Sequence, residues 1–459
     1  MNKLALSFLL IALAVSGYPI FGNFAQAYTT EIYRDTFWGS QSLGGPVVVK
    51  DGATLTISAG AKVDLNGYYL QVDGCLVAKG AAGSLIQFND GAVSFTETST
   101  PWNEQTSSGC IIEYAMINCT VSTVGAPKIS NSYIDGEFFA AGGSPVLTSD
   151  LVTGSMKVSG SSTVSWSDFK ARPVFGGSSA ISYCNFAEGI TTEGESVSIS
   201  HSNIICGHEP FTPADASIRF AAINVDKGAA EIFCNNFTLP HDTPSAGAGI
   251  WLGTQVNAYI HDNNITDFGS GGSAGIYGAQ VGNVTIEKNL ISLSHRGIIL
   301  GGYQAQPSGT ILIEKNTISN NVVGFDGYCA PTFRYNNIYN DYEIYSTIKY
   351  VYYGQAIDAV NNWWGTADEQ VIDRKLEGLI DFKPFLNSRV DDAMPDISAN
   401  DLPNPASASG LTAINPLLIN PFLMQIIALA AFIVVTLAVF LLVKRQRDRL
   451  PSGGVKHDP

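Results

Sequence analysis

The residues best suited to acid–base chemistry in this chain lie between positions 261 and 296. His295 and Arg296 form the only His–Arg doublet, and a base beside a cation suits proton abstraction from an acidic sugar. Lys288 and Asp262 stand at matching places in neighbouring repeats and complete the set of catalytic candidates. The alternative, which we favour, is that these four residues belong to ordinary surface turns.

A charge pattern runs through the same region. Glu287-Lys288 and Glu314-Lys315 recur at equal repeat positions, and His261-Asp262 occupies the same two columns one repeat earlier. Stacked strands would place like charges directly over one another and opposite charges on the diagonal. This pattern favours a solvated, salt-bridged face, and a sugar-facing site is the alternative.

Histidine and cysteine spacings give no metal signature. Five of the six histidines (201, 208, 241, 261 and 295) lie in the region where the repeats lengthen, but none has His-x-His or His-x₃-His spacing. The seven cysteines match no zinc pattern. We therefore expect no metal and no cofactor, with Ca²⁺ left open by the acidic composition. Cys110 with Cys119, and Cys184 with Cys206 or Cys234, are the disulfide pairs to test.

The elements that position these residues are short repeats. The phrase apolar-x-x-Asn-x-apolar recurs at Ile232, Ile260, Ile286, Ile313 and Phe333, and earlier copies carry a small residue in place of Asn at steps of 17 or 18 residues. Short β-branched strands separated by Gly, Asn and Ser turns predict an all-β fold, a single-stranded parallel β-helix in which coils stack. The recurring asparagines would form an internal structural ladder. Its predicted members are Asn235, Asn263, Asn289, Asn316, Asn336 and Asn361.

A second column precedes the ladder position by one residue. It holds Tyr114, Trp166, Tyr183, His201 and Tyr335. Exposed aromatic rings in a row can stack on sugars. The favoured interpretation is that these rings cover the corners of the coils.

These phrases resemble those of right-handed parallel β-helices, most closely the pectate-lyase-like and NosD-like repeats of carbohydrate-associated and surface proteins. The resemblance rests on the Asn263, Asn289 and Asn316 phrases, each followed by a Gly-apolar strand, and covers residues 46–386. It implies a right-handed β-helix whose outer face would carry any active site. It implies little about function, because this fold hosts lyases, hydrolases, adhesins and inert spacers.

The two ends predict export and membrane attachment. Residues 1–27 read as a signal peptide with an A-x-A site at Ala25–Ala27, and residues 422–443 are an uncharged apolar stretch long enough to span a bilayer. The basic residues of 444–459 place this tail in the cytoplasm. Between them we expect a lead-in at 28–45, the β-helix at 46–386 and a flexible stalk at 387–421.

Charge and sequons describe the exported part. The net charge of −15 becomes about −19 once the leader (Lys3) and the span and tail (five basic residues, Asp448 and Asp458) are removed. This charge disfavours a nucleic-acid partner. Four Asn-x-Thr sequons, at Asn118, Asn236, Asn264 and Asn283, are candidate N-glycosylation sites.

Together these features predict a single-pass cell-membrane protein with an extracellular β-helix. We expect a non-enzymatic role toward a glycan, an envelope polymer or another surface protein. The alternative is a surface polysaccharide lyase or glycoside hydrolase acting on the outer face of the β-helix. A structural spacer, a rod of about 65–70 Å at 4.8 Å per coil, is the third class.

Overall fold

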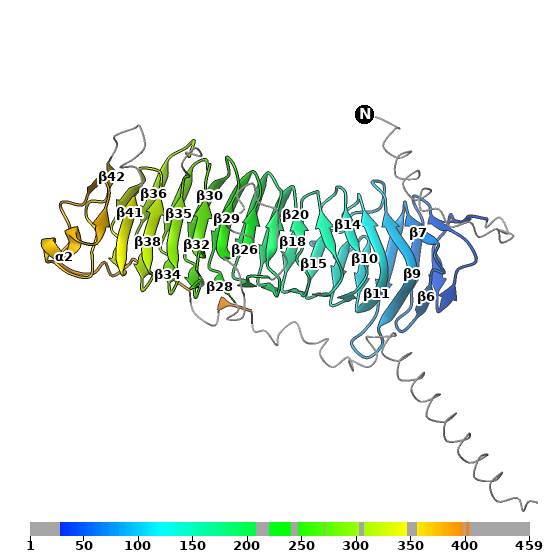
Figure 1. The fold of residues 1–459 in the computed structure, drawn as a ribbon. Helices are drawn as coiled ribbons and strands as arrows, with labels where there is room; N and C mark the ends of the chain where they lie inside the picture. The colour runs from blue at the N-terminus through cyan, green and yellow to red at the C-terminus, as the bar shows by residue number, and fades with distance from the viewer. Residues whose placement is uncertain are drawn as a thin grey trace, which may run out of the picture.

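The computed structural model describes residues 28–207, 220–239, 247–269, 271–302, 307–346, 356–397 and 401–403. In this part of the chain nearly all regular structure is parallel β-strand, arranged in one sheet of 28 strands (sheet A) and one of 16 (sheet B). Figure 1 shows the coils stacked into a single rod, with the N-terminal strands at one end and the helix α2 (Glu369–Asp373) at the other. The predicted parallel β-helix is confirmed.

Each coil contributes one strand to each of three faces. The B face is sheet B; the A1 and A2 faces are the two halves of sheet A. The strands of the B face are β2 (Thr36–Trp38), β5 (Thr54–Ile57), β8 (Cys75–Lys79), β10 (Ile111–Glu113), β12 (Lys128–Ser130), β15 (Val146–Thr148), β18 (Thr163–Ser165), β21 (Ser178–Ser182), β24 (Ser196–Ser200), β27 (Ala229–Phe233), β30 (Asn257–His261), β33 (Val284–Glu287), β36 (Ile311–Glu314), β39 (Thr332–Arg334), β42 (Ile357–Asp358) and β44 (Ile380–Asp381).

The A1 strand follows the B strand after a sharp corner. The A1 face consists of β3 (Gln41–Ser42), β6 (Lys62–Asp64), β13 (Tyr133–Ile134), β16 (Leu151–Val152), β19 (Asp168–Phe169), β22 (Asn185–Phe186), β25 (Asn203–Ile205), β28 (Asn236–Thr238), β31 (Asn264–Thr266), β34 (Leu290–Ser292), β37 (Thr317–Ser319) and β40 (Asn337–Tyr339). Two long strands, β9 (Ile86–Phe95) and β11 (Ala115–Thr123), belong to A1 and A2 at once.

The A2 strand completes the coil. The A2 face consists of β1 (Thr30–Ile32), β4 (Val47–Val49), β7 (Tyr69–Val72), β14 (Phe138–Ala140), β17 (Met156–Val158), β20 (Val174–Phe175), β23 (Ile190–Thr192), β26 (Phe220–Val225), β29 (Gly247–Leu252), β32 (Ala274–Gly278), β35 (Arg296–Leu300), β38 (Val323–Gly327), β41 (Tyr342–Ser346) and β43 (Leu376–Glu377).

Columns of apolar side chains fill the interior. On the B face Ile199, Ile232, Ile260, Ile286 and Ile313 lie in register and are fully buried. Burial of one such side chain contributes about 1.5–3 kcal/mol. Because the register is fixed by these columns, every outward-facing side chain also stands directly above its equivalent in the next coil.

The corner between the B and A1 faces has a constant backbone conformation. From β10 to β39, the residue after each B strand adopts a positive φ although it is not glycine; examples are Trp166 (55°), Asp262 (53°) and Lys288 (52°). This residue, in the left-handed conformation, bends the chain sharply from the B face to the A1 face. As a result the following residue, at the ladder position, points into the core.

The segment predicted to begin a flexible stalk lies against the β-helix over its first part. Val390 N donates to Asn337 Oδ1 (2.8 Å), Thr317 Oγ donates to the Ala393 carbonyl (2.6 Å), and Asn203 Nδ2 donates to the Pro403 carbonyl (2.9 Å). Residues 387–397 and 401–403, here called the strap, therefore run back along the A1 face, and Figure 1 shows an orange part of the chain near β28.

Residues 1–27 and 404–459 lie outside the described part of the chain, and with them the predicted signal peptide, apolar span and basic tail. Among the residues that the structure does describe, no helix has the length and apolar character needed to cross a bilayer.

Candidate functional site

The inner asparagines bond from coil to coil. The backbone N–H and the Nδ2 of Asn263 both donate to Asn289 Oδ1 (both 3.0 Å), while Nδ2 also donates to the Ile232 carbonyl (2.7 Å). The same set of bonds links the whole series of fully buried asparagines: Asn235, Asn263, Asn289, Asn316, Asn336 and Asn362. This ladder has every amide engaged with protein, so it holds the coils together and binds nothing else.

The last rung corrects the sequence-based assignment by one residue. Asn336 donates to Asn362 Oδ1, whereas Asn361 takes the left-handed corner position with a φ of 58°. Two consecutive asparagines fit the repeat phrase equally well, and only the corner geometry distinguishes them.

Toward the N-terminus the ladder continues with smaller side chains and one acid. Ser132 N donates to Asp150 Oδ1 (2.8 Å), Asp150 N donates to Ser167 Oγ (3.1 Å), and Cys184 N donates to Ser202 Oγ (3.1 Å). Asp150 is fully buried, and this burial raises the pKa of its carboxyl to about 8. The group therefore lies in the core as a carboxylic acid at neutral pH.

An aromatic column follows the outside of the B–A1 corner. The rings of Trp166 and Tyr183 stack with centroids 4.4 Å apart, and Tyr183 stacks on His201 at 4.8 Å. Farther along, Phe233 stacks on His261 at 5.0 Å. His201 meets Phe233 edge to face at 5.8 Å, and Trp166, the first ring of this run, is 47 % exposed.

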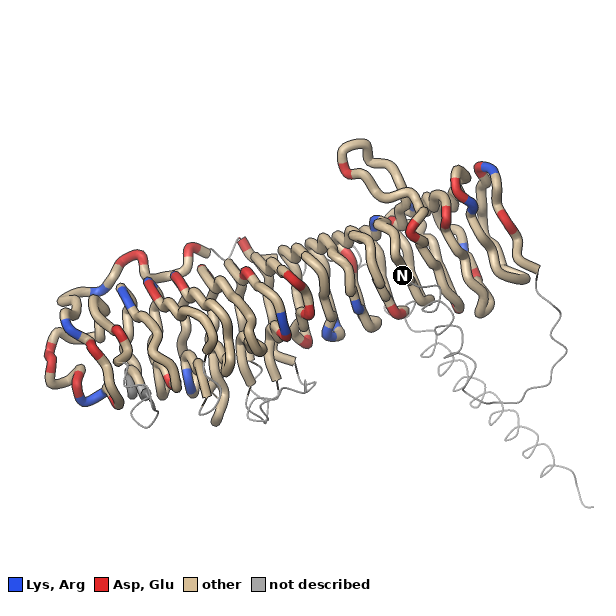
Figure 2. Tube along the Cα trace, turned by 90° about the horizontal axis from the view of Figure 1, so that it is seen from above, with Lys and Arg blue, Asp and Glu red and all other residues tan. Residues whose placement is uncertain are grey.

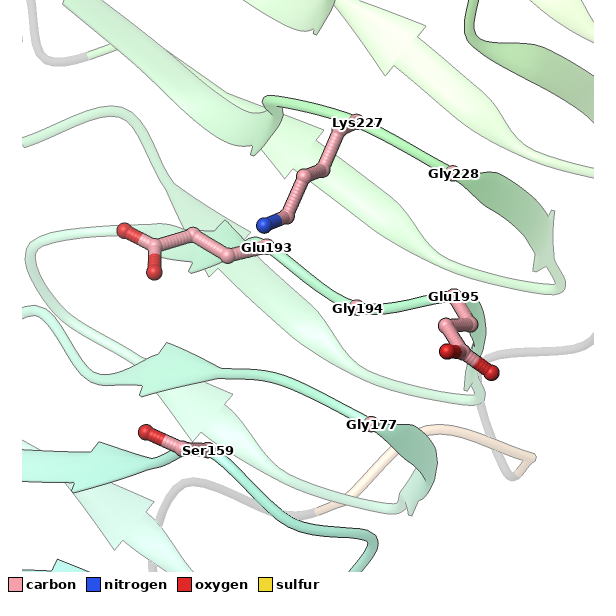
Figure 3. Close-up of a pocket in the computed structure, with 7 residues that line it drawn as sticks. All are labelled: Ser159, Gly177, Glu193, Gly194, Glu195, Lys227 and Gly228. Carbon is pink, nitrogen blue, oxygen red and sulfur yellow. The ribbon is translucent and has the colours of Figure 1, made fainter. Parts of the chain in front are cut away.

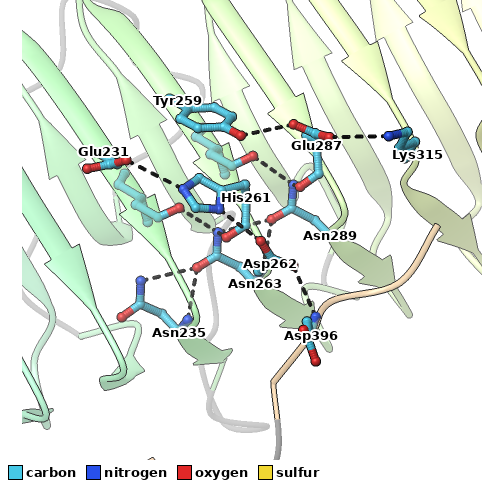
Figure 4. A network of polar contacts seen from close by, with 12 residues as sticks. Glu231, Asn235, Tyr259, His261, Asp262, Asn263, Glu287, Asn289, Lys315 and Asp396 are labelled. Atoms are coloured by element: carbon cyan, nitrogen blue, oxygen red, sulfur yellow. Dashed lines mark hydrogen bonds and ion pairs between the residues drawn. The ribbon is translucent and has the colours of Figure 1, made fainter. Parts of the chain in front are cut away.

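His261 is at the centre of a polar network on the B face (Figure 4). Its Nδ1 lies 2.9 Å from Asp262 Oδ2, and its Nε2 lies 3.6 Å from Glu231 Oε1. Tyr259 stacks on the imidazole ring at 4.1 Å. Nε2 is buried and makes no hydrogen bond with the described residues. The imidazole is thus held rigidly between two carboxylates and two rings.

The two glutamates near His261 differ in their contacts with other side chains. Tyr259 Oη donates to Glu287 Oε2 (2.9 Å), and the Lys315 ammonium lies 3.8 Å from Glu287 Oε1. Burial and the neighbouring Glu287 raise the pKa of Tyr259 to about 12, so its phenol stays protonated. Glu231, by contrast, is half exposed. Glu231, Tyr259, His261 and Glu287 form what we call the His261 cluster.

Two members of this cluster were missed in the sequence. Glu231 and Tyr259 stand opposite each other on β27 and β30, and each lies two residues before the aromatic residue of its own strand. Their alternation with buried Ala230 and Ala258 marks them as outward-facing. The predicted diagonal pairing between the Glu-Lys columns appears once, between Glu287 and Lys315.

The strap borders the cluster. Asp396 N donates to Asp262 Oδ1 (3.0 Å), and Asp392 lies 3.8 Å from the Lys315 ammonium. Asp262 therefore joins His261 to the strap, as Figure 4 shows. A residue proposed as catalytic from its spacing acts here as a link between the corner and the C-terminal segment.

The four catalytic candidates do not come together. Lys288 precedes β34 and His295 follows it, so these residues stand at two different corners of the coil. Arg296 Nε donates to Asp326 Oδ2 (2.7 Å) and its Nη1 lies 3.3 Å from His295 Nδ1. Burial, reinforced by the Arg296 charge, lowers the pKa of His295. Asp262 is bonded to His261, away from this doublet.

The four sequons lie in different surroundings. Asn264 Nδ2 donates to Asn236 Oδ1 (2.8 Å), and Asn118 Nδ2 donates to Asn89 Oδ1 (3.1 Å), so three of them belong to side-chain pairs on the A1 face. Asn283 is exposed in a turn and accepts from Thr310 N through Oδ1 (2.9 Å).

A shallow depression lies at a turn of the middle coils (Figure 3). Its floor is backbone, because a Cβ on Gly228 would stand 2.0 Å from the Gly194 carbonyl oxygen. Glu193, Glu195 and Lys227 stand on its rim. The exposed Glu193 pairs with Lys157 at 3.3 Å, and no buried polar group points into the depression. We regard it as a consequence of close coil packing.

Comparison with known proteins gives one match. Residues 160–378, slightly less than half of the chain, match the NosD family, described as "Periplasmic copper-binding protein (NosD)". No curated protein and no solved structure matches this chain. The likeness supports an exported β-helix protein of the binding type.

The described residues do not fit a resident copper centre. Copper takes thiolate, thioether and imidazole ligands arranged around one point. Within the described ranges no group of three or more His, Cys, Asp or Glu side chains is placed to hold a metal ion. His201, His261 and His295 lie on separate coils or corners, and two of them are packed in ring stacks. No step of function is therefore assigned to copper.

Proposed function

We propose that this protein is an exported, membrane-anchored β-helix that binds a hydroxyl-rich glycan or envelope polymer without cleaving it. The observation that carries the proposal is the His261 cluster: a half-exposed carboxylate, a protonated phenol and an oriented imidazole side by side on a rigid sheet. A sugar hydroxyl can donate to the Glu231 carboxylate or to the Tyr259 phenol oxygen, whose own O–H is donated to Glu287. The membrane span predicted at residues 422–443 would supply the anchor.

The geometry of the cluster suits binding better than hydrolysis. Glu231 and Glu287 lie on β27 and β33, two strands apart, which is about 9.6 Å between backbones. Glu287 is already engaged by Tyr259 and Lys315. A hydrolase needs one carboxylic acid and one free carboxylate facing the same bond, and here a single free carboxylate, Glu231, is presented.

The test uses the full-length chain in detergent on a glycan array, followed by calorimetry with the best ligand. Glu231→Gln should weaken binding about tenfold or more, because a hydrogen bond to a charged group contributes about 1.5–3 kcal/mol. Tyr259→Phe should weaken binding about two- to tenfold, because a hydrogen bond to a neutral group contributes about 0.5–1.5 kcal/mol. Tyr259→Phe keeps the ring that stacks on His261. Glu193→Gln, an exposed glutamate at the distant depression, is the matched control and should bind normally. Equal affinities for all variants, or an array without hits, would refute the proposal.

A polysaccharide lyase remains the second candidate because of one observation. The lowered pKa of His295 leaves its imidazole neutral and able to accept a proton near pH 7. The assay is release of unsaturated product from acidic polysaccharides by the full chain. His295→Gln should abolish such release if His295 is the base; cleavage that survives this change assigns the base elsewhere.

A further inference from the structure

Two of the seven cysteines meet between neighbouring coils. Cys75 begins β8 and Cys110 immediately precedes β10, and these two strands pair with Ile111 opposite Val77. Continued by one residue, this register places Cys110 opposite Leu76, so Cys75 is its diagonal neighbour. Strand spacing of 4.8 Å and a rise of 3.3 Å put the two Cα atoms about 5.8 Å apart, inside the 4.4–6.8 Å range of disulfides.

The Cys110 side chain lies against the backbone that leads into Cys75. Cys110 Sγ lies 3.6 Å from the carbonyl oxygen of Gly74, the residue before Cys75. This position directs the Cys110 thiol, as a hydrogen-bond donor, toward the Cys75 sulfur. That hydrogen bond lowers the pKa of Cys75, which is half-buried, while the pKa of the buried Cys110 is raised.

The other five cysteines lack such a neighbour among the described residues and are chemically quiet. Burial raises the pKa of Cys119, Cys184, Cys206 and Cys329 to about 12 and that of Cys234 to about 11. Cys184 serves as a ladder residue, since its backbone N–H donates to Ser202 Oγ (3.1 Å) and its Sγ lies 3.2 Å from the Ser182 carbonyl oxygen. The odd number of cysteines is thus explained as one reactive pair, four buried side chains and the half-buried Cys234.

We propose that Cys75 and Cys110 form a disulfide that staples adjacent coils in the exported protein. The Cys75 thiolate attacks one sulfur of an oxidant's disulfide, forming a mixed disulfide and releasing the other oxidant sulfur as a thiolate. Cys110 then loses its proton and displaces the remaining oxidant sulfur. Two protein thiols are oxidised, and two electrons and two protons reduce the oxidant to a dithiol. The oxidant is a thiol–disulfide oxidoreductase of the exported compartment, or oxidised glutathione in vitro.

The position of this bond gives it a structural consequence. Between Thr100, whose N–H donates to the Gly74 carbonyl, and Cys110, whose N–H donates to the Thr100 carbonyl, the chain makes an excursion from the coil. Trp102 in this excursion lies against the Lys128 ammonium at 5.0 Å from the ring centre. A disulfide at its base fixes the excursion to the preceding coil.

The experiment oxidises the full-length chain in detergent with oxidised glutathione, alkylates the remaining thiols under denaturing conditions and maps the peptides by mass spectrometry. A cross-link between Cys75 and Cys110 is expected, with the other five cysteines alkylated. The oxidised protein should melt several degrees above the reduced one, because the bond restricts the unfolded chain. Hydrogen exchange in residues 101–109 should slow.

Two variants separate this bond from other effects. Cys75→Ser should remove the cross-link and the difference in melting temperature between the oxidised and reduced protein. Cys119→Ser, which replaces a buried cysteine on the neighbouring long strand β11, should keep both. Seven alkylated cysteines after oxidation, or a bond from Cys110 to Cys119, would overturn the proposal. The peptide map of the oxidised wild-type protein shows whether the Cys75–Cys110 bond forms, even where a variant folds poorly.

Discussion

At the scale of single residues, Asp150 is unusual because its carboxyl group is buried in the core of the β-helix. It occupies a ladder position where later coils carry asparagine, and burial raises the pKa of its carboxyl to about 8. In the unfolded chain this pKa is about 3.9. Between pH 4 and pH 8 the folded protein therefore holds one more proton than the unfolded chain. The contribution of the protonated Asp150 carboxyl to the stability of the fold is therefore complete below pH 4 and is lost as the pH rises toward 8.

The predicted change is a loss of unfolding free energy of about 1.4 kcal/mol per pH unit in this window from Asp150 alone. Asp150→Asn should remove that component, because its amide carries no charge and can act as Asn235 does in the ladder. Denaturant unfolding at several pH values measures it. Ser202→Ala is the control, since it alters another ladder position, where Ser202 Oγ accepts from Cys184 N, and carries no titrating group, so the slope should stay intact. An unchanged slope in Asp150→Asn would count against a protonated Asp150.

At the scale of elements, the strap is held by side chains that act in place of a paired strand. Asn337 accepts from Val390 N (2.8 Å) and donates to the Val390 carbonyl (2.9 Å), and Ala393 of the strap is itself fully buried. Asn337→Asp removes the donor and turns a carboxylate toward a carbonyl oxygen. A lost bond of this kind costs about 1–3 kcal/mol. Amide exchange in residues 388–396 should therefore accelerate about 10- to 100-fold.

The matched control for the strap is Asn185→Ala, which alters the same column of outer asparagines several coils away from Val390. Its exchange in residues 388–396 should equal that of the unchanged protein. If Asn337→Asp also leaves exchange unaltered, the strap is held by its other contacts, at Thr317 and Asp262, and Asn337 carries little of its stability.

The strap also shows where sequence patterns stop being informative. The repeat phrase locates the B strands, the corner and five of the six ladder asparagines, because each depends on periodic burial that is visible in the sequence. The Asn361–Asn362 pair is ambiguous since both fit the phrase. The residues of the strap and of the His261 cluster do not recur with the repeat. Asp396 contacts Asp262 from the C-terminal segment, and Glu231 contacts His261 across two coils of unequal length. Such contacts depend on how segments distant in the sequence align with each other, which the sequence around each residue does not show.

At the scale of the whole molecule, the strap determines where a membrane anchor would attach. Its last described residue, Pro403, is bonded to Asn203 on β25. The coil of β25 contains β24, the ninth of the sixteen B strands, so the attachment lies near the middle of a rod about 72 Å long. Figure 2 shows Lys/Arg and Asp/Glu residues together at both ends of the rod, so neither end has charge of a single sign that would favour an upright orientation.

We therefore predict that the anchored rod lies side-on to the bilayer, if residues 422–443 span it as proposed. Eighteen residues separate Pro403 from Phe422; if they form the flexible stalk predicted from the sequence, they would span about 23 Å on average. Energy transfer from dyes at exposed Tyr33 and Leu379, near the two ends, to a bilayer dye should be similar for both positions. A dye at Leu379 much closer to the bilayer than one at Tyr33 would show an upright rod. Asn337→Asp should broaden both distances, because releasing the strap lengthens the tether.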